Sequence, residues 1–142
     1  MPVSLILAAD SEGELAGMLA HSIAHIVEGH GTRMAARRQV GNSNFLLVFA
    51  GGWIGMGAAG NTRPSVPMAY LKLWRSYEVD ADRQAVNMMA AAGYEPGALL
   101  AYIRRTQRAG SNVFSALPGR EERIAALEAA IARLPQRGGI VR

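Results

Sequence analysis

Two histidines, His21 and His25, lie four residues apart in a stretch with the composition of a helix. Side chains with this spacing sit one turn apart on the same helix face, so both imidazoles can bind a single metal ion. The chain has no cysteine, which excludes thiolate ligands and leaves His, Asp or Glu as further ligands. Taken alone, the pair is equally compatible with two hydrogen-bonded helix histidines that bind no metal.

The residue next to the first histidine is Ser22. In the zinc-protease motif H-E-x-x-H this position holds a glutamate, the general base that deprotonates zinc-bound water. A serine hydroxyl is not a base near neutral pH, and general acid–base help is worth ~10²–10⁴ in rate. Glu28 is a poor substitute, because seven residues of helix place it ~10 Å along the axis from His21. The sequence therefore predicts a metal site whose hydrolytic chemistry is impaired at Ser22.

A second stretch supplies two carboxylates, Glu78 and Asp82, which are also spaced to share one helix face. Catalytic zinc sites have three protein ligands, and two histidines with one glutamate are a known set, so Glu78 can complete it. Asp82 can accept a hydrogen bond from a ligand histidine and fix its tautomer. In the alternative interpretation both carboxylates pair only with Arg75 and Arg83 on a solvated face.

His21 and His25 can share a metal only if they lie on a helix, and the boundaries of that helix can be predicted. Ser11-Glu12-Gly13-Glu14 has the form of a capping box, which predicts a helix from about Glu12 to Glu28 that ends at Gly29. The histidines are expected beside its apolar stripe. His30 either caps this helix end, the interpretation we prefer, or lies on the rim of the site. The stripe consists of Leu15, Met18, Leu19 and Ile26.

The second pair is expected on a helix over Met68–Ala92 that Gly93 ends as a C-cap. Two further helices are predicted, from Pro96 to about Arg108 and from Arg120 to Leu134, with loops elsewhere. Residues 30–44 are interpreted as a loop or a frayed helix end, and Val3–Leu7 is the one candidate strand. The apolar face of the second helix comprises Tyr70, Leu73, Tyr77, Ala81, Ala85 and Met88.

These elements predict a mainly α fold, in which four helices surround a core and the metal lies between the first two long helices. We expect one domain over residues 1–142, with residues 1–10 as the remnant of an upstream segment and residues 135–142 as a loose tail. Half of the residues are apolar, which is enough for a core of this size.

Composition and charge narrow the classes of partner. The net charge is +4, but the basic residues are scattered and aromatics are only 6%, so a nucleic-acid-binding surface is not expected. Phe45–Gly60 is apolar throughout, yet a membrane span needs about 20 residues, so a buried hairpin or helix is favoured over membrane association. Met1–Ala9 lacks the basic start of a signal peptide, and the compartment is left unassigned.

The motifs also occur in an order that resembles metallopeptidase family forty-eight, which includes the CAAX prenyl proteases and bacterial heat-shock membrane proteases. The resemblance covers residues 14–127, and its separate pieces are modest whereas the ordered set is specific. The matching segments are Glu14-Leu15-Ala16-Gly17-Met18-Leu19-Ala20-His21, His25 with Gly29-His30, Tyr77-Glu78-Val79-Asp80-Ala81-Asp82-Arg83-Gln84-Ala85, Ala92-Gly93-Tyr94-Glu95-Pro96 and Glu122-Arg123-Ile124-Ala125-Ala126-Leu127.

The resemblance implies a zincin-like helical metalloprotease core. It implies that Zn²⁺ is bound by His21, His25 and Glu78, with Asp82 as the supporting acid. It also implies a peptide or protein as substrate or partner, and it allows a location in the bacterial cell envelope.

Three departures separate the chain from the family pattern. Ser22 replaces the catalytic glutamate, Leu117 stands where the family often has a histidine in Thr-His-Pro, and most of the N-terminal β-sheet segment has no match. The sequence therefore predicts a zinc-binding metalloendopeptidase-like domain that is catalytically impaired or inactive. One alternative is an active zinc endopeptidase with a non-standard base, supplied for example by a partner chain. The other is a metal-free module for interaction or homodimerisation.

Overall fold

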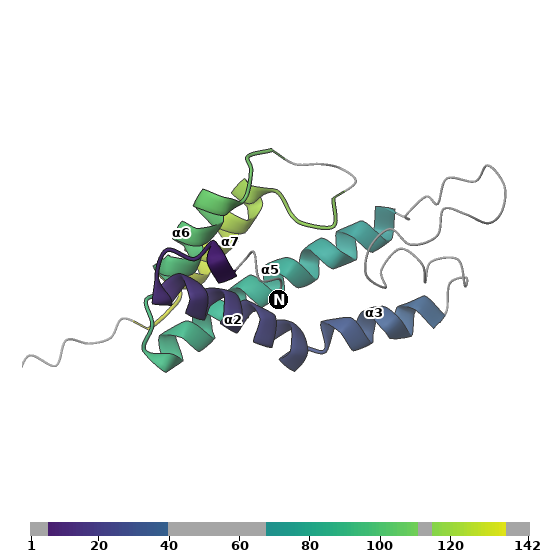
Figure 1. Ribbon diagram of the computed structural model, residues 1–142. Helices are drawn as coiled ribbons and strands as arrows, with labels where there is room; N and C mark the ends of the chain where they lie inside the picture. The colour runs from purple at the N-terminus through teal and green to yellow at the C-terminus, as the bar shows by residue number, and fades with distance from the viewer. Residues whose placement is uncertain (1–5, 40–67, 111–114, 136–142) are drawn as a thin grey trace, which may run out of the picture.

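Helices are the only regular elements in the part of the chain that the computed structural model describes, which is residues 6–39, 68–110 and 115–135. Within these ranges no strand occurs, as the mainly α prediction requires. The helices are α2 (Glu12–Val27), α3 (His30–Gln39), α5 (Met68–Ala92), α6 (Gly97–Thr106) and α7 (Arg120–Ala132). Helices α2 and α5 pack side by side, and α6 and α7 pack against the part of this pair that is remote from α3 (Figure 1).

Helix α2 begins and ends where its caps predict. The Ser11 hydroxyl accepts a hydrogen bond of 3.1 Å from the Glu14 amide, and the Glu14 carboxylate accepts one of 2.8 Å from the Asp10 amide. At the other end Glu28 is the C-cap and Gly29 has a φ of +62°. Because this left-handed conformation costs little for glycine, the chain turns sharply here and starts a new helix.

The buried face of α2 differs from the predicted one. Leu19 and Ile26, two residues of the predicted apolar stripe, are 45% and 79% exposed, so this stripe is not the buried face of α2. The histidines, which were expected beside the stripe, lie on the buried face itself. The physical reason is that small residues set this contact. A Cβ on Gly17 would come within 2.8 Å of the Leu99 Cβ, so α6 approaches α2 closely at this point. The buried residues of α2 are Glu14, Gly17, Met18, Ala20 and Ala24.

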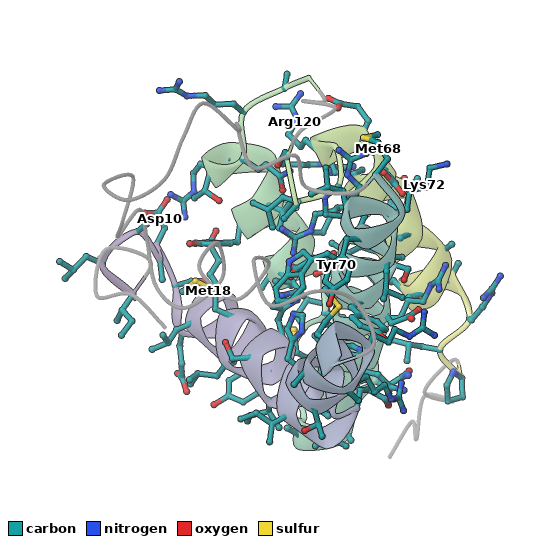
Figure 2. The ribbon with its side chains drawn as sticks, turned by 90° about the vertical axis from the view of Figure 1, so that its right-hand side faces the viewer. Asp10, Met18, Met68, Tyr70, Lys72 and Arg120 are labelled. Carbon is teal, nitrogen blue, oxygen red and sulfur yellow. The ribbon has the colours of Figure 1, made fainter. Side chains whose placement is uncertain are left out.

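Two sequence-based interpretations near the N-terminal half were also wrong. His30–Gln39 is a separate helix instead of a loop or a frayed helix end, because tertiary contacts anchor a segment that has few apolar residues. Met34 is buried, and the Tyr70 hydroxyl donates a 3.3 Å hydrogen bond to the Met34 carbonyl. Figure 2 shows Tyr70 on α5 directed toward α3, whereas Lys72 points outward. Ile6 and Leu7 are helical, which contradicts the candidate strand over Val3–Leu7 as far as it is described.

The remaining helices match their predicted positions. Helix α5 covers the predicted residues, and after it Gly93 has a φ of +88° while the Tyr94 amide donates to the Met89 carbonyl at 2.9 Å. Pro96 is the N-cap of α6. The core where α2, α5, α6 and α7 meet is formed by Met18, Ala20, Ala85, Val86, Met89, Leu99, Tyr102, Ile103 and Leu127.

The apolar segment Phe45–Gly60 lies outside the described residues. Among the helices that are described, none has the length and the apolar composition needed to cross a bilayer.

Candidate metal centre

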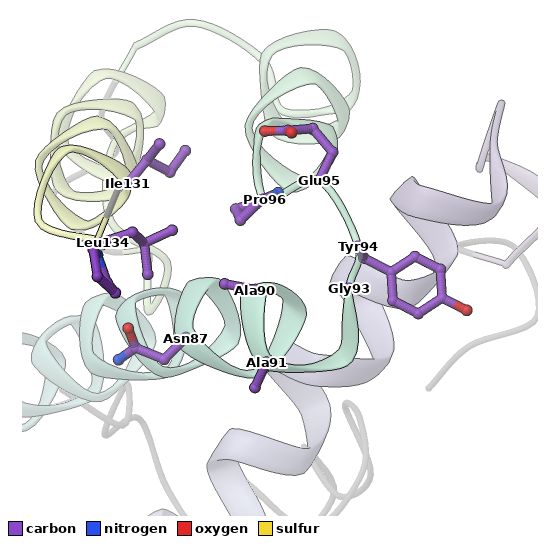
Figure 3. A pocket seen from close by; sticks show the side chains of 10 residues that line it. Asn87, Ala90, Ala91, Gly93, Tyr94, Glu95, Pro96, Ile131 and Leu134 are labelled. Carbon is purple, nitrogen blue, oxygen red and sulfur yellow. The ribbon is translucent and has the colours of Figure 1, made fainter. Parts of the chain in front are cut away.

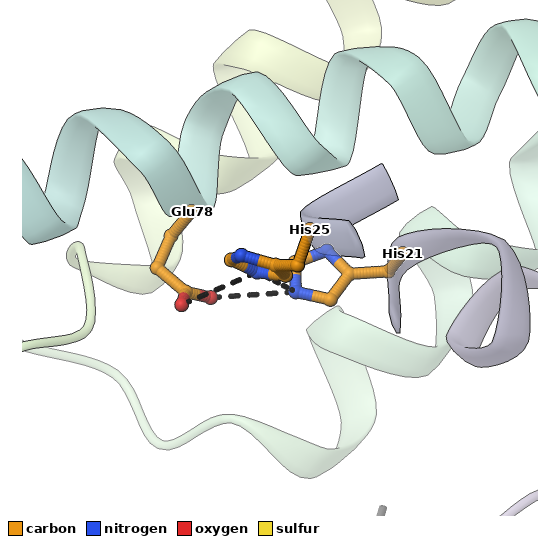
Figure 4. Close-up of side chains that lie close together, drawn as sticks. All are labelled: His21, His25 and Glu78. Atoms are coloured by element: carbon orange, nitrogen blue, oxygen red, sulfur yellow. Dashed lines mark hydrogen bonds and ion pairs between the residues drawn. The ribbon is translucent and has the colours of Figure 1, made fainter. Parts of the chain in front are cut away.

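The contact between α2 and α5 brings the two predicted pairs of residues together. Ala24 on α2 and Ala81 on α5 are fully buried, and small residues of this kind let two helices approach closely. His21 and His25 therefore face Glu78 across the contact, as Figure 4 shows. Glu78 and Asp82 are only 7% and 0% exposed, so the alternative that placed them on a solvated face was wrong.

The spacing of the three side chains matches the size of a zinc ion. His21 Nε2 lies 3.2 Å from His25 Nε2 and 3.3 Å from Glu78 Oε2, while His25 Nε2 lies 3.4 Å from Glu78 Oε1. Ligands about 2.0–2.1 Å from a tetrahedral zinc ion lie about 3.3 Å from one another. Two imidazoles and one carboxylate are also a ligand set that zinc uses, so these residues fit the ion in both size and chemistry.

A chain of buried polar contacts continues behind His21. Its Nδ1 is 2.8 Å from Asp82 Oδ1, so Nε2 is the nitrogen that faces His25 and Glu78. Arg123 on α7 donates to both oxygens of Asp82, at 2.7 Å from Nε and 2.6 Å from Nη2. The Nη1 of Arg123 donates to Gln107 Oε1 at 3.1 Å, and Gln107 Nε2 donates to the Pro118 carbonyl at 2.8 Å. The orientation of His21 is thus fixed by α5, α7 and the loop before α7.

A different contact lies behind His25. Its Nδ1 is 3.1 Å from Nδ1 of His30, and the His30 ring stacks on Tyr77 with centroids 4.4 Å apart and an angle of 12°. His30 is 2% exposed. The side chain thus contacts a residue of the cluster instead of capping the end of α2, which was the preferred interpretation, and its burial does not suit a residue on the rim.

The charges of the cluster shift its pKa values strongly. Burial by itself raises the pKa of the Glu78 carboxyl, but hydrogen bonds and charges from His21 and His25 outweigh burial and lower it to about 2. Burial lowers the pKa of His21, but Asp82 and Glu78 together raise it to about 9. Near neutral pH the His21 imidazole of the metal-free cluster therefore carries a proton on both ring nitrogens. A metal ion that binds at Nε2 must displace the proton there.

The pKa values of the two supporting residues, Asp82 and His30, are both lowered, which leaves one charged and the other neutral. Burial raises the pKa of Asp82, but hydrogen bonds from Arg123 and His21 outweigh burial and lower the pKa, so Asp82 is a carboxylate. Burial lowers the pKa of His30, and the charges of His25 and Arg33 lower it further, so His30 is a neutral imidazole.

The structure also places Ser22 and Leu117, at which the chain departs from the family pattern, and Glu28, the substitute base that was considered. The Ser22 hydroxyl donates a 3.0 Å hydrogen bond to the Met18 carbonyl, one turn back along α2. Glu28 accepts a 3.2 Å hydrogen bond from Gln84 and lies 3.9 Å from Arg33. Leu117 is 46% exposed.

The loop that contains Leu117 is tied to the same helix as Glu78. Arg75 donates to the Ser115 carbonyl at 3.1 Å from Nε and at 2.9 Å from Nη2, and the Ser115 hydroxyl accepts from the Leu117 amide at 3.1 Å. Pro118 is buried. Arg75 thus ties this loop to the helix that carries Glu78, and Gln107 holds it at the Pro118 carbonyl.

Sequence reasoning named the three candidate ligands and Asp82, but it missed the contacts that Arg123 and His30 make behind them. Arg123 was part of a matching motif without a role, and the signal that could have found it is that a buried carboxylate such as Asp82 needs a cation. The sequence offers 15 Lys and Arg residues for this task, so the pattern alone does not select one. His30 was noticed, but its contact depends on the unpredicted helix α3.

A separate surface hollow of about 780 Å³ lies between the end of α5, the turn at Gly93–Pro96 and α7 (Figure 3). Its lining includes Tyr94, Ile131 and Leu134, and no residue of the metal cluster. The cluster is therefore a feature of the α2–α5 contact and not part of this hollow.

Comparison with known proteins gives a family. The model of peptidase family M48 matches residues 2–131. A Vibrio cholerae protein, whose description as a beta-barrel assembly-enhancing protease is provisional, is 32% identical over 109 residues, which are 71% of this chain and 22% of that protein. The beta-barrel assembly-enhancing proteases of Yersinia pestis and Escherichia coli are 27% and 26% identical over 104 residues, 68% of this chain and 21% of each relative.

The chain thus spans about a fifth of the length of the curated relatives that it matches. No solved structure matches the chain. The family model covers nearly all of the described residues, including both helices of the cluster, and confirms the resemblance inferred from the order of the motifs. The chain belongs to peptidase family M48, a family of zinc metallopeptidases.

Proposed function

We propose that this chain is a zinc-binding metallopeptidase domain of family M48 whose hydrolytic activity is lost or strongly reduced. The zinc ligands are His21, His25 and Glu78. The observation that supports this most strongly is the set of three distances between their ligand atoms, 3.2, 3.3 and 3.4 Å, which agree with the edges of a zinc tetrahedron.

The side chains around the ligands suit this role. Asp82 holds His21 by Nδ1, which leaves Nε2 for the metal, and a carboxylate in this position raises the basicity of a ligand imidazole. The negative charge of Glu78 partly offsets the charge of the ion. A bound zinc ion would polarise a carbonyl group and lower the pKa of a water molecule.

The missing element is a base that could take the proton of that water. Ser22 occupies the relevant position, and its hydroxyl donates to the Met18 carbonyl. Glu28, the C-cap of α2, accepts a hydrogen bond from Gln84 and faces Arg33. Ser22 has the position but not the carboxylate, and Glu28 has a carboxylate at a different position, so we propose that the domain binds the metal without efficient hydrolysis.

The class of ligand and the compartment follow from the relatives. Because the relatives are named as proteases that enhance beta-barrel assembly, we propose that the domain acts on or binds polypeptide chains in the bacterial cell envelope.

The test restores the base and measures proteolysis. Ser22→Glu should raise the zinc-dependent cleavage of casein by ~10²–10⁴ over the unaltered chain, because it supplies the general base. Ser22→Gln is the matched control, since it has the same shape without the carboxylate and should leave cleavage at the level of the unaltered chain. A chelator, and Glu78→Ala in the Ser22→Glu background, should abolish the gain.

The two alternatives give different results in the same assay. An active enzyme with a non-standard base requires the unaltered chain to cleave casein at a rate near that of Ser22→Glu, with loss of cleavage in Glu78→Ala. A metal-free module requires that the chain bind no zinc and that Ser22→Glu remain inactive.

A further inference from the structure

His30 is a buried residue whose position is fixed by contacts with helix α5. It is the first residue of α3 and is 2% exposed, and its ring stacks on Tyr77, the neighbour of Glu78. Helix α3 is tied to α5 a second time through the hydrogen bond from Tyr70 to the Met34 carbonyl. The imidazole therefore has a fixed position relative to α5.

His30 contacts the metal cluster through His25, whose ring it meets edge to face with centroids 5.0 Å apart, and one pair of nitrogens lies within hydrogen-bond distance. His30 Nδ1 is 3.1 Å from His25 Nδ1, while the other nitrogen of His25 faces His21 and Glu78 at 3.2 and 3.4 Å. His25 is thus held between the cluster and His30.

The chemistry of imidazole then assigns the direction of this hydrogen bond. A histidine that binds a metal ion through Nε2 carries its proton on Nδ1, so Nδ1 of His25 must donate. The partner atom at 3.1 Å must accept, which requires His30 Nδ1 to carry no proton. His30 must then be a neutral imidazole with its proton on Nε2.

We propose that His30 is a positioning residue for the metal site, which accepts a hydrogen bond from His25 Nδ1 and so keeps His25 Nε2 free and aimed at the ion. This inference rests on the proposed zinc site. The two ligand histidines then have different hydrogen-bond partners behind them. His21 contacts a buried carboxylate, Asp82, whereas His25 contacts a neutral imidazole. A neutral acceptor fixes the ring without adding a further charge behind the ligands.

Two substitutions separate the hydrogen bond from the packing. His30→Phe keeps a ring against Tyr77 but removes the acceptor. His30→Asn keeps an acceptor near the position of Nδ1 but loses the ring. If the hydrogen bond positions His25, His30→Phe should weaken zinc binding about 10- to 100-fold, and His30→Asn should stay within about threefold of the unaltered chain. The thermal stability of the metal-free proteins should follow the opposite order, with His30→Phe above His30→Asn.

Met34→Ala provides a control for a loosened helix, because it removes a buried side chain of α3 and leaves the imidazoles of His25 and His30 in the chain. Zinc affinity, measured by competition with a chromogenic chelator, should change little in this variant. The inference is overturned if His30→Phe binds zinc as tightly as the unaltered chain, or if zinc affinity follows thermal stability through all three variants. In these outcomes the unaltered chain still binds zinc and the proposed function stands; if the unaltered chain binds none, both fail.

Discussion

Asp82 is the residue at which the charges of the site are balanced. It is fully buried, lies 2.8 Å from His21 and receives two hydrogen bonds from Arg123. A buried carboxylate without a partner is costly, and Arg123 supplies the partner through a planar pair of N–H groups that matches the carboxylate geometry. The metal site therefore depends on a residue of α7 that acts on His21 through Asp82.

Removing this partner should destabilise the fold. Arg123→Met removes two charge-assisted hydrogen bonds from the buried Asp82 and leaves His21 as its remaining cationic partner, which we expect to lower the free energy of unfolding by up to about 3–5 kcal/mol. Arg104→Met is the matched control, because Arg104 pairs with Glu128 on the exposed surface, where such pairs contribute about 0–1 kcal/mol. Urea denaturation of the metal-free proteins measures both. Equal losses in the two variants would contradict the role given to Asp82 and Arg123.

The raised pKa of His21 predicts how the stability of the metal-free protein depends on pH. The pKa is about 9 in the folded protein and about 6.5 in an unfolded chain. The resulting stabilisation is complete below the unfolded pKa and is lost as pH rises through the folded one. Between pH 6.5 and 9 the protein should therefore lose up to about 3 kcal/mol, seen as a falling Tm in the presence of chelator.

Replacing the titrating group tests the assignment to His21. His21→Gln should show a nearly constant Tm over the same pH window, although it starts from a lower value. If the unaltered chain has a Tm independent of pH from 6.5 to 9, His21 is not held protonated by Asp82 and Glu78.

Helices whose ends are set by nearby residues, such as α2 and α5, could be predicted from the sequence, whereas α3 could not. Ser11 and Gly93 fix the start of α2 and the end of α5 through their own side chain and backbone, so the sequence determines these boundaries locally. Helix α3 has one buried apolar residue, Met34, and depends on Tyr70 and Tyr77 of α5. The residues of α3 themselves give no sign of such contacts, which is why the segment was interpreted as a loop or a frayed helix end.

The close approach of α2 and α6 gives a prediction at this scale. Gly17→Ala should destabilise the protein by about 1–3 kcal/mol, because the added Cβ would meet the Leu99 Cβ at 2.8 Å and its Cα at 3.2 Å. This outweighs the gain of up to about 1 kcal/mol from replacing glycine by alanine in a helix. Thermal or urea unfolding measures the change.

Gly31→Ala is the control, since nothing lies within 4 Å of the added Cβ. It should leave stability unchanged or raise it by roughly 0.5 kcal/mol. A stabilised Gly17→Ala protein would mean that α2 and α6 are farther apart than described.

At the scale of the whole molecule, the cluster is the point where separate helices meet. Helices α2 and α5 supply the ligand atoms, α7 supplies Arg123, the end of α6 leads to Gln107, and α3 supplies His30. The ligand candidates could be predicted, because each pair has the i, i+4 spacing of one helix face and the motif order is that of the family. Asp82 was predicted with them, but the contacts of Arg123, Gln107 and His30 could not be, because pairing between elements far apart in the chain leaves no periodic signal.

The measurement that tests the account most directly is the metal content of the purified protein, by elemental analysis after incubation with zinc and removal of the excess. The unaltered chain should hold about one zinc ion per chain, and Glu78→Ala should hold almost none. Glu128→Ala, which removes an exposed carboxylate paired with Arg104, should keep the full amount. An unaltered chain without zinc, or a Glu78→Ala variant that retains it, would contradict the proposed metal site.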